Sequence, residues 1–335
     1  MNICLCCQKK IENGISYHSK CLKKLFGTEK IPGINFASTE IISEISKNIG
    51  KMSISGVQIK ASVKLDRKKN IIEIVQTGGT HILKPEPGDY PGLTQNENLC
   101  MNMAEAAGME VPPHGLFYLA DRKLCYIVRR FDREDKGQKI HVEDMAQLME
   151  LPSDSKYEAS LEKVGNTILK FSKRPYLDLI NFLERVIFCF LIGNGDMHLK
   201  NWSLISSPEG VEDAQDARDV KGAQAPQSDY RLAPCYDLIC SKLYLPVEDE
   251  SALTINGKRN KISIADFTAF AEYLKIDKKA FQNIILKFQD LRETFLEIIE
   301  NAIFFERADT LKEIFTGNYT KLFSEQLLKG KMHIL

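Results

Sequence analysis

Hydrophobic and polar residues alternate with a period of two in several short segments of the first half of the chain. This alternation is typical of strands that are buried on one face. The predicted strands are 57–66, 70–75, 81–84, 115–120 and 124–131. Apolar residues at helical spacing predict helices at 31–50 and 96–108. The first half is therefore predicted to be a mainly antiparallel sheet that carries helices.

From residue 142 onward the apolar spacing becomes helical. The predicted helices are 161–172, 176–193, 267–274, 279–304 and a last one from 310 onward. Residues 206–228 contain five Asp or Glu and almost no large apolar residue, so we expect a mobile surface insertion there. The pattern predicts an α+β protein with a β-rich lobe, 31–137, and an α-helical lobe, 138–335.

Composition narrows the classes of function. The chain has 335 residues, with 45 Lys or Arg and 45 Asp or Glu, and therefore no formal net charge. This balance argues against direct nucleic-acid binding and against a polybasic membrane-surface protein. The longest apolar run, 186–192, is far shorter than the roughly 20 residues that cross a bilayer. We expect a cytoplasmic protein that does not contact the membrane.

The first 30 residues form a segment rich in cysteine and histidine. Cys4 and Cys7 are separated by two residues, as are His18 and Cys21. This spacing is close to that of small zinc knuckles, so these four residues are a candidate zinc site. The alternative is a thiol-rich segment without metal in a reducing compartment.

Two acidic residues and one amide have the pattern of a phosphoryl-transfer site. Asp196 and Asn201 have the Asp-x4-Asn spacing of a kinase catalytic loop, in which the Asp takes the hydroxyl proton and the Asn binds Mg²⁺. Asp237, after an extended apolar segment, is a candidate second Mg²⁺ ligand. The spacing alone is weak, because Asp and Asn are common in turns.

Lys84 ends a predicted strand after a Gly-Gly turn, where its ammonium group could reach the phosphates of ATP. Glu97, in the helix that follows, could pair with it as a kinase strand lysine pairs with a helical glutamate. The alternatives are a solvent-facing Lys84 and a Glu97 that only favours the first turn of its helix. The segment 53–60 has one glycine and matches no general phosphate-binding motif.

Eight short segments, taken together, resemble the HipA-like serine/threonine kinases, the toxins of bacterial toxin–antitoxin modules. They are Met52–Lys60, Gly78–Pro85, Asn96–Asn98, Ala107–Pro112, Val128–Arg133, Glu143–Met145, Gly193–Asn201 and Leu232–Asp237. The chain most resembles the short HipT-type kinases of three-component modules. The insertion at 206–228 is longer than this pattern leads us to expect.

The resemblance implies a two-lobed, protein-kinase-like fold of the phosphoinositide-kinase-like branch and the cofactors ATP and Mg²⁺. It implies Asp196 as catalytic base, Asn201 and Asp237 as Mg²⁺ ligands, and Lys84 on the ATP phosphates. The other implied nucleotide-binding residues are Ser55, Gly56, Val57, Gln58, Ile59 and Lys60 in a phosphate loop, Arg129, Arg130 and Phe131 in the hinge, and His198 and Tyr236 in the pocket.

The resemblance also implies regulation and partners. Ser53 holds the position at which the family phosphorylates and disables itself, and Ser55 is a second candidate. The implied partners are a small antitoxin protein that supplies a missing N-terminal subdomain, a DNA-binding antitoxin, and a translation component such as an aminoacyl-tRNA synthetase as the substrate.

Other functions remain open at this point. The same residues would serve a small-molecule or lipid kinase equally well. A catalytically silent, partner-binding pseudokinase is disfavoured, because a scaffold has no need of Lys84, Asp196, Asn201 and Asp237 together. A metallohydrolase based on Asp196, His198 and Asp237 is disfavoured too, because no further histidine is placed to complete its ligand set.

Overall fold

A computed structural model describes residues 2–12, 14–41, 43, 59–134, 137–206 and 229–328. The chain forms two compact units: unit 1 contains 1–139 and 294–309, and unit 2 contains 140–293 and 310–335. The boundary lies close to the predicted one, but 294–309 belongs to unit 1 rather than to the predicted second lobe. Helical periodicity predicts that Phe295 and Ile299 are buried, as observed. It does not predict in which of the two units they are buried.

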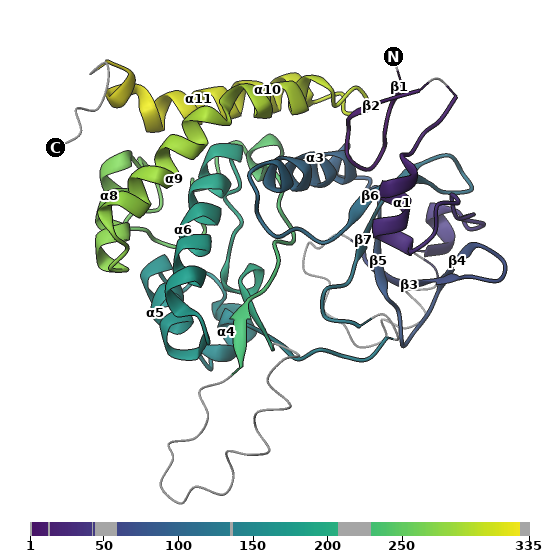
Figure 1. Ribbon diagram of the computed structural model, residues 1–335, viewed down its shortest axis with the longest axis horizontal. Helices are drawn as coiled ribbons and strands as arrows, with labels where there is room; N and C mark the ends of the chain where they lie inside the picture. Colours follow the sequence, from purple (N-terminus) through teal and green to yellow (C-terminus); the bar gives the residue numbers. More distant parts are fainter. Residues whose placement is uncertain are drawn as a thin grey trace, which may run out of the picture. The chain divides into compact units, whose positions relative to one another are not determined.

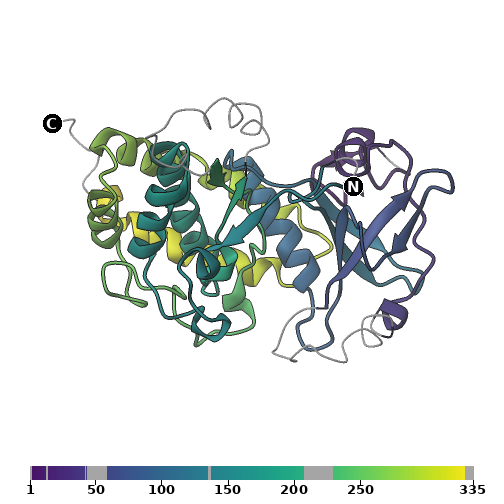
Figure 2. The same cartoon turned by 90° about the horizontal axis from the view of Figure 1, so that it is seen from below.

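Unit 1 is built on a five-stranded antiparallel sheet with the strand order β4-β3-β5-β7-β6 (Figure 1). The strands are β3 (Ala61–Asp66), β4 (Ile71–Ile74), β5 (His81–Pro85), β6 (His114–Tyr118) and β7 (Leu124–Arg129). The turned view of Figure 2 shows the twist of this sheet. The predicted strands are thus confirmed, with β3 beginning at Ala61 and β7 ending at Arg129.

Helix α3 (Leu93–Ala106) packs against β6 and β7. Its apolar residues Leu99 and Met103 are fully buried, as the predicted helix 96–108 requires. The polar residues Asn96, Glu97 and Asn98 are equally buried. Burial of so many polar side chains is costly unless each has a partner, so this helix has a task beyond filling the core.

The N-terminal segment has more regular structure than its sequence predicts. It contains the short hairpin β1 (Asn2–Ile3) and β2 (Lys10–Ile11), followed by helix α1 (Ser19–Phe26). The predicted helix 31–50 is wrong over 31–37, which is not helical. Pro32 and Gly33 disfavour a helix, and Gly33 instead forms a bridge to Ile71. Residues 38–41 and 43 are helical, and 44–50 lie outside the described residues.

Unit 2 is largely helical, as predicted. The helices assigned within it or continuing from it are α4 (Met145–Leu148), α5 (Leu161–Phe171), α6 (Pro175–Ile192), α8 (Ile264–Tyr273), α9 (Lys278–Asp290), α10 (Arg292–Glu300) and α11 (Ala308–Leu328), and three short 3-10 turns are η1 (Ser153–Ser155), η2 (Leu199–Asn201) and η4 (Ser241–Leu243). The predicted single helix 279–304 is interrupted after Asp290, so it forms α9 and α10. In the described part of the chain, no helix has both the length and the apolarity to span a membrane.

Unit 2 also contains a small antiparallel sheet that the sequence pattern did not predict. Its order is β10-β9-β8, with β8 (Val142–Asp144), β9 (Ser203–Ser206) and β10 (Tyr230–Leu232). Strands of three or four residues are too short to show a clear alternation. Most of the predicted insertion, 207–228, lies outside the described residues.

Asp178 holds the beginning of α6 and strand β10 together. Its side chain is fully buried and accepts hydrogen bonds from the Ser172 hydroxyl (2.6 Å), the Leu232 backbone N–H (2.8 Å) and the Arg174 Nε (3.1 Å). The chain runs from β10 to Asp237. The Asp178 carboxylate therefore holds the strand that precedes this predicted site residue.

We expect Asp178→Ala to lower the free energy of unfolding by about 3 kcal/mol, because it leaves several buried donors without their acceptor. Urea denaturation of the full chain measures this loss. Asp154→Ala, at an exposed position in η1, is the matched control and should change stability by less than about 0.5 kcal/mol. Equal stability of the two variants would contradict the structural role of Asp178.

Candidate active site and cysteine cluster

The predicted catalytic loop begins where α6 ends. Gly193 has φ = 71°, in the left-handed region, and its N–H caps the last turn of the helix. The next residues turn back sharply: the Asp196 N–H donates to Oδ1 of Asn194 (3.2 Å), and Gly195 donates to the Ser241 hydroxyl (2.8 Å). A buried helix that ends in a glycine turn therefore presents Asp196.

Asp196 and Asn201 lie beside each other. The Asn201 Nδ2 donates to the backbone carbonyl of Asp196 (2.9 Å). The Asp196 carboxylate accepts a hydrogen bond from the Tyr157 hydroxyl (2.8 Å). Because the amide nitrogen of Asn201 is engaged by the loop, its oxygen is the end that is directed away and suited to a hard cation.

Asp237 follows β10 and has φ = 54°, in the left-handed region that few side chains adopt. Its neighbour Tyr236 is half-buried, and the Tyr236 hydroxyl donates to the carbonyl of Lys200 in η2 (3.0 Å). This bond holds the Tyr236–Asp237 segment against the turn that contains Asn201. Strain at one carboxylate-bearing position is typical of functional sites.

His198 links the two carboxylates electrostatically. Burial lowers the pKa of His198, and the charges of Asp196 and Asp237 both act on its ring in the opposite direction. The ring also packs edge-on against Tyr157, with 5.2 Å between ring centroids. Within unit 2, Asn201 is thus hydrogen-bonded to the backbone of Asp196, and the charges of Asp196 and Asp237 both act on His198.

Tyr157 was not predicted from the sequence. It lies 39 positions before Asp196, and only the fold places its hydroxyl on the carboxylate. Burial and the hydrogen bond to Asp196 raise the pKa of Tyr157, so the phenol keeps its proton and remains a donor. It therefore fixes the orientation of the carboxylate.

In unit 1, Lys84 and Glu97 form a buried ion pair. The Lys84 Nζ lies 2.5 Å from Oε1 of Glu97, and the two side chains are 4% and 2% exposed. Lys84 lies opposite Tyr126 in the register of β5 and β7, with its Nζ 5.7 Å from the centre of the tyrosine ring. The solvent-facing alternative for Lys84 is therefore wrong, and the predicted pairing with Glu97 is present.

The predicted hinge residues are the last residue of β7, Arg129, and the two residues that follow it, Arg130 and Phe131. The Arg130 side chain forms a bidentate ion pair with Asp132 (2.8 and 2.7 Å). The backbone N–H of Arg130 donates to the carbonyl of Thr80. Burial opposes ionisation of Asp132, but Arg130 and Arg133 hold its pKa below the usual range. Arg129 and Phe131 are half-buried beside this pair. Their contact with a nucleotide stays a prediction.

The predicted phosphate loop and modification sites fall mostly outside the described residues. These are Ser53, Ser55, Gly56, Val57 and Gln58, while Ile59 and Lys60 are described and directly precede β3. Their roles stay predictions.

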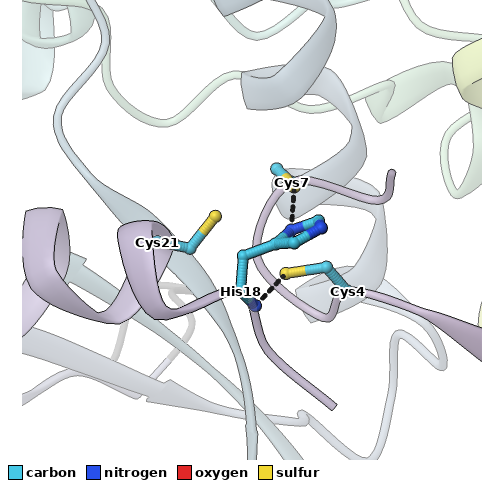
Figure 3. Close-up of side chains that lie close together, drawn as sticks. All are labelled: Cys4, Cys7, His18 and Cys21. Carbon is cyan, nitrogen blue, oxygen red and sulfur yellow. Dashed lines mark hydrogen bonds between the residues drawn. The ribbon is translucent and has the colours of Figure 1, made fainter. Parts of the chain in front are cut away.

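Cys4, Cys7, His18 and Cys21 converge on one point (Figure 3). The ligand atoms of all four side chains lie within 4.8 Å of one another. Cys7 Sγ is 3.3 Å from His18 Nδ1, and the backbone N–H of His18 donates to Cys4 Sγ (3.4 Å). Neighbouring thiols, Cys21 first among them, lower the pKa of Cys4. The predicted ligand set is thus assembled in space.

Comparison with known proteins assigns residues 52–295 to the HipA-like C-terminal domain. Y4dM of Sinorhizobium fredii, a candidate kinase by its name, is 31% identical over 242 residues, which cover 68% of this chain and 54% of that protein. The serine/threonine-protein kinase toxin HipA of Shewanella oneidensis is 26% identical over 250 residues, covering 68% of this chain and 52% of the toxin. The chain therefore spans about half the length of these relatives.

Solved structures show the same fold. The Shewanella oneidensis HipA chain, in a complex with HipB and operator DNA, matches with a TM-score of 0.66 at 20% identity, covering 89% of this chain and 74% of HipA. The Helicobacter pylori proinflammatory kinase CtkA matches with a TM-score of 0.52 at 15% identity, covering 84% of this chain and 96% of CtkA. The predicted kinase-like fold is confirmed.

We expect Lys84→Met and Glu97→Leu each to lower the free energy of unfolding by about 3 kcal/mol, because each leaves a buried charge without its counter-ion. The double variant should lose less than the sum of the two, since it leaves no charge behind. Urea denaturation measures the cycle.

The pair Lys69 and Glu73 on the surface of unit 1 is the matched control, with 3.6 Å between its charged atoms and side chains that are 66% and 34% exposed. Removing it should change the free energy of unfolding by less than about 1 kcal/mol. Additive losses at Lys84 and Glu97 would show that the two charges do not depend on each other.

Proposed function

Because the chain belongs to the family defined by the HipA-like C-terminal domain, we propose that it is an ATP- and Mg²⁺-dependent protein serine/threonine kinase that serves as the toxin of a bacterial toxin–antitoxin module. The observation that supports the proposal is that Asn201 is hydrogen-bonded to the backbone of Asp196, while the charges of Asp196 and Asp237 both act on His198. Membership of the family alone would leave a pseudokinase equally acceptable, whereas this constellation has the composition that phosphoryl transfer needs.

The donor set fits Mg²⁺. A carboxylate and an amide oxygen are hard ligands, and together they bring less charge than two carboxylates would. Asn201 and Asp237 would hold the ion, which neutralises charge on the phosphates when it is bound. The hydrogen bond from Asn201 Nδ2 to the Asp196 carbonyl orients the amide for this task before any ligand arrives.

Asp196 would accept the proton of the substrate hydroxyl. The Tyr157 hydroxyl holds one of its carboxylate oxygens, which leaves the other to face the hydroxyl. Lys84 would contact the phosphates of ATP, with Glu97 fixing the position of its ammonium group. His198 and Tyr236 would line the nucleotide pocket.

We expect Asp196→Asn and Asp237→Asn each to lower the rate of phosphate transfer from radiolabelled ATP by about 100- to 10,000-fold, because a proton acceptor or a metal ligand is lost. The readouts are incorporation of label into the protein itself and hydrolysis of ATP. Both variants should keep the unfolding midpoint of the wild type within a few degrees.

Asp154→Asn removes an exposed carboxylate from the same unit and should leave the rate unchanged. If Asp196→Asn retained a rate near that of the wild type, the assignment of this residue would be overturned. If the wild type were stabilised by ATP with Mg²⁺ but transferred no phosphate, the pseudokinase alternative would be favoured instead.

Regulation by self-phosphorylation is the second part of the proposal. A phosphoserine would add about −1.5 to −2 charges next to the predicted phosphate loop and oppose the binding of ATP. We expect intact-mass spectrometry to find phosphate on the wild type and none on Ser53→Ala with Ser55→Ala or on Asp196→Asn. A phosphate that persists in the double serine variant would place the modification elsewhere.

The partners follow from the relatives. The HipA structure that matches this chain is a complex with HipB and operator DNA, so we propose a DNA-binding antitoxin for this chain as well. We also propose a small antitoxin protein as a partner, as the resemblance to HipT-type kinases implies. The proposed substrate is a translation component such as an aminoacyl-tRNA synthetase.

A further inference from the structure

The four side chains of the cysteine cluster come from two neighbouring pieces of the N-terminal segment. Cys4 and Cys7 belong to the turn between β1 and β2, and His18 and Cys21 lie at the beginning of α1. We propose that these four residues bind a structural Zn²⁺ ion that fastens this segment to the sheet and helix α3 of unit 1.

The size and chemistry of the cluster suit zinc. A tetrahedral zinc with bonds of about 2.3 Å to sulfur holds its ligand atoms about 3.8 Å apart. The four ligand atoms here already lie within 4.8 Å of one another, so small side-chain rotations bring them to this geometry. On binding, three S–H bonds break, three protons leave to solvent, and four bonds to the metal form.

The set of four protein ligands leaves no coordination position for water or substrate, which is characteristic of structural rather than catalytic zinc. Three thiolates also select against the hard cations Mg²⁺ and Ca²⁺. The site is therefore distinct in its chemistry from the carboxylate site of unit 2.

The surroundings of His18 fix which ring nitrogen would bind the metal. Its Nε2 lies 3.2 Å from the backbone carbonyl of Lys10, which can only accept a hydrogen bond. Nε2 therefore carries the proton, and Nδ1, which faces the thiol of Cys7, keeps its lone pair. Such a carbonyl partner behind a ligating histidine is typical of zinc sites.

The turn that holds Cys4 and Cys7 is bound to both layers of unit 1. The carbonyl of Cys6 accepts hydrogen bonds from the side chains of Asn98 (3.3 Å) and Asn102 (2.8 Å) of α3. The Leu116 N–H of β6 donates to the carbonyl of Leu5 (3.0 Å). Gly115 allows this close approach, because a Cβ there would overlap Cys6.

A metal ion in this turn would therefore stabilise α3, which carries Glu97 next to Asn98. Loss of zinc should weaken the support of the Lys84–Glu97 pair and lower kinase activity without changing the residues of unit 2. The expected loss of activity rests on the proposed kinase function, whereas the zinc site itself does not.

The test is the zinc content of the full-length protein, purified without chelators and measured by elemental mass spectrometry. We expect about one zinc per chain in the wild type and almost none in Cys7→Ser or Cys21→Ser, whose thiols are only half-buried. Cys6→Ser is the matched control from the same turn and should keep its zinc. Asp196→Asn should also keep it, so failure of the kinase proposal leaves this result intact.

A second measurement covers variants that fail to fold. The wild type, stripped of metal and loaded with Co²⁺, should show the intense absorption of tetrahedral cobalt bound by thiolates, and Cys21→Ser should lose most of it. A wild type that is metal-free with reduced or disulfide-linked cysteines, or a weak octahedral cobalt spectrum, would overturn the proposal.

Discussion

The buried contact between Lys84 and Glu97 is the constraint on which unit 1 depends. Two charges that are almost wholly removed from water are stable only if their geometry is held closely, because desolvation costs several kcal/mol for each ion. The register of β5 against β7 fixes Lys84, and α3 fixes Glu97. Any part of the molecule that positions α3 therefore acts on this pair, which gives the cysteine-rich turn an influence beyond its own few contacts.

In unit 2, backbone turns set the positions of the two acidic residues of the candidate site. Asp196 follows a helix that ends in a left-handed glycine, and Asp237 is itself left-handed in the segment that follows a strand anchored by Asp178. The two turns belong to segments that are far apart in the chain, yet the charges of both carboxylates act on His198.

The elements with clear periodicity, such as 161–172 and 124–131, were predictable because a buried face dominates their sequences. So were the spacings of Asp196 with Asn201 and of Cys4 with Cys7, since each reflects a local turn. The break at Pro32 and Gly33 was missed because the following apolar residues have helical spacing. Tyr157 was not predictable, because a hydroxyl that meets a carboxylate through tertiary folding leaves no periodic signal.

Helix α3 shows where sequence periodicity stops being informative. A helix with one buried face should separate apolar from polar residues, yet α3 buries Asn96, Glu97, Asn98 and Asn102 together with its leucines and methionines. These polar residues have separate tasks. Glu97 meets Lys84, whereas Asn98 and Asn102 meet the carbonyl of Cys6. A helix that satisfies a charge on the sheet and a carbonyl in the cysteine-rich turn cannot shift without breaking one of these contacts. The buried polar residues of α3 therefore depart from the apolar pattern because they make these two sets of contacts.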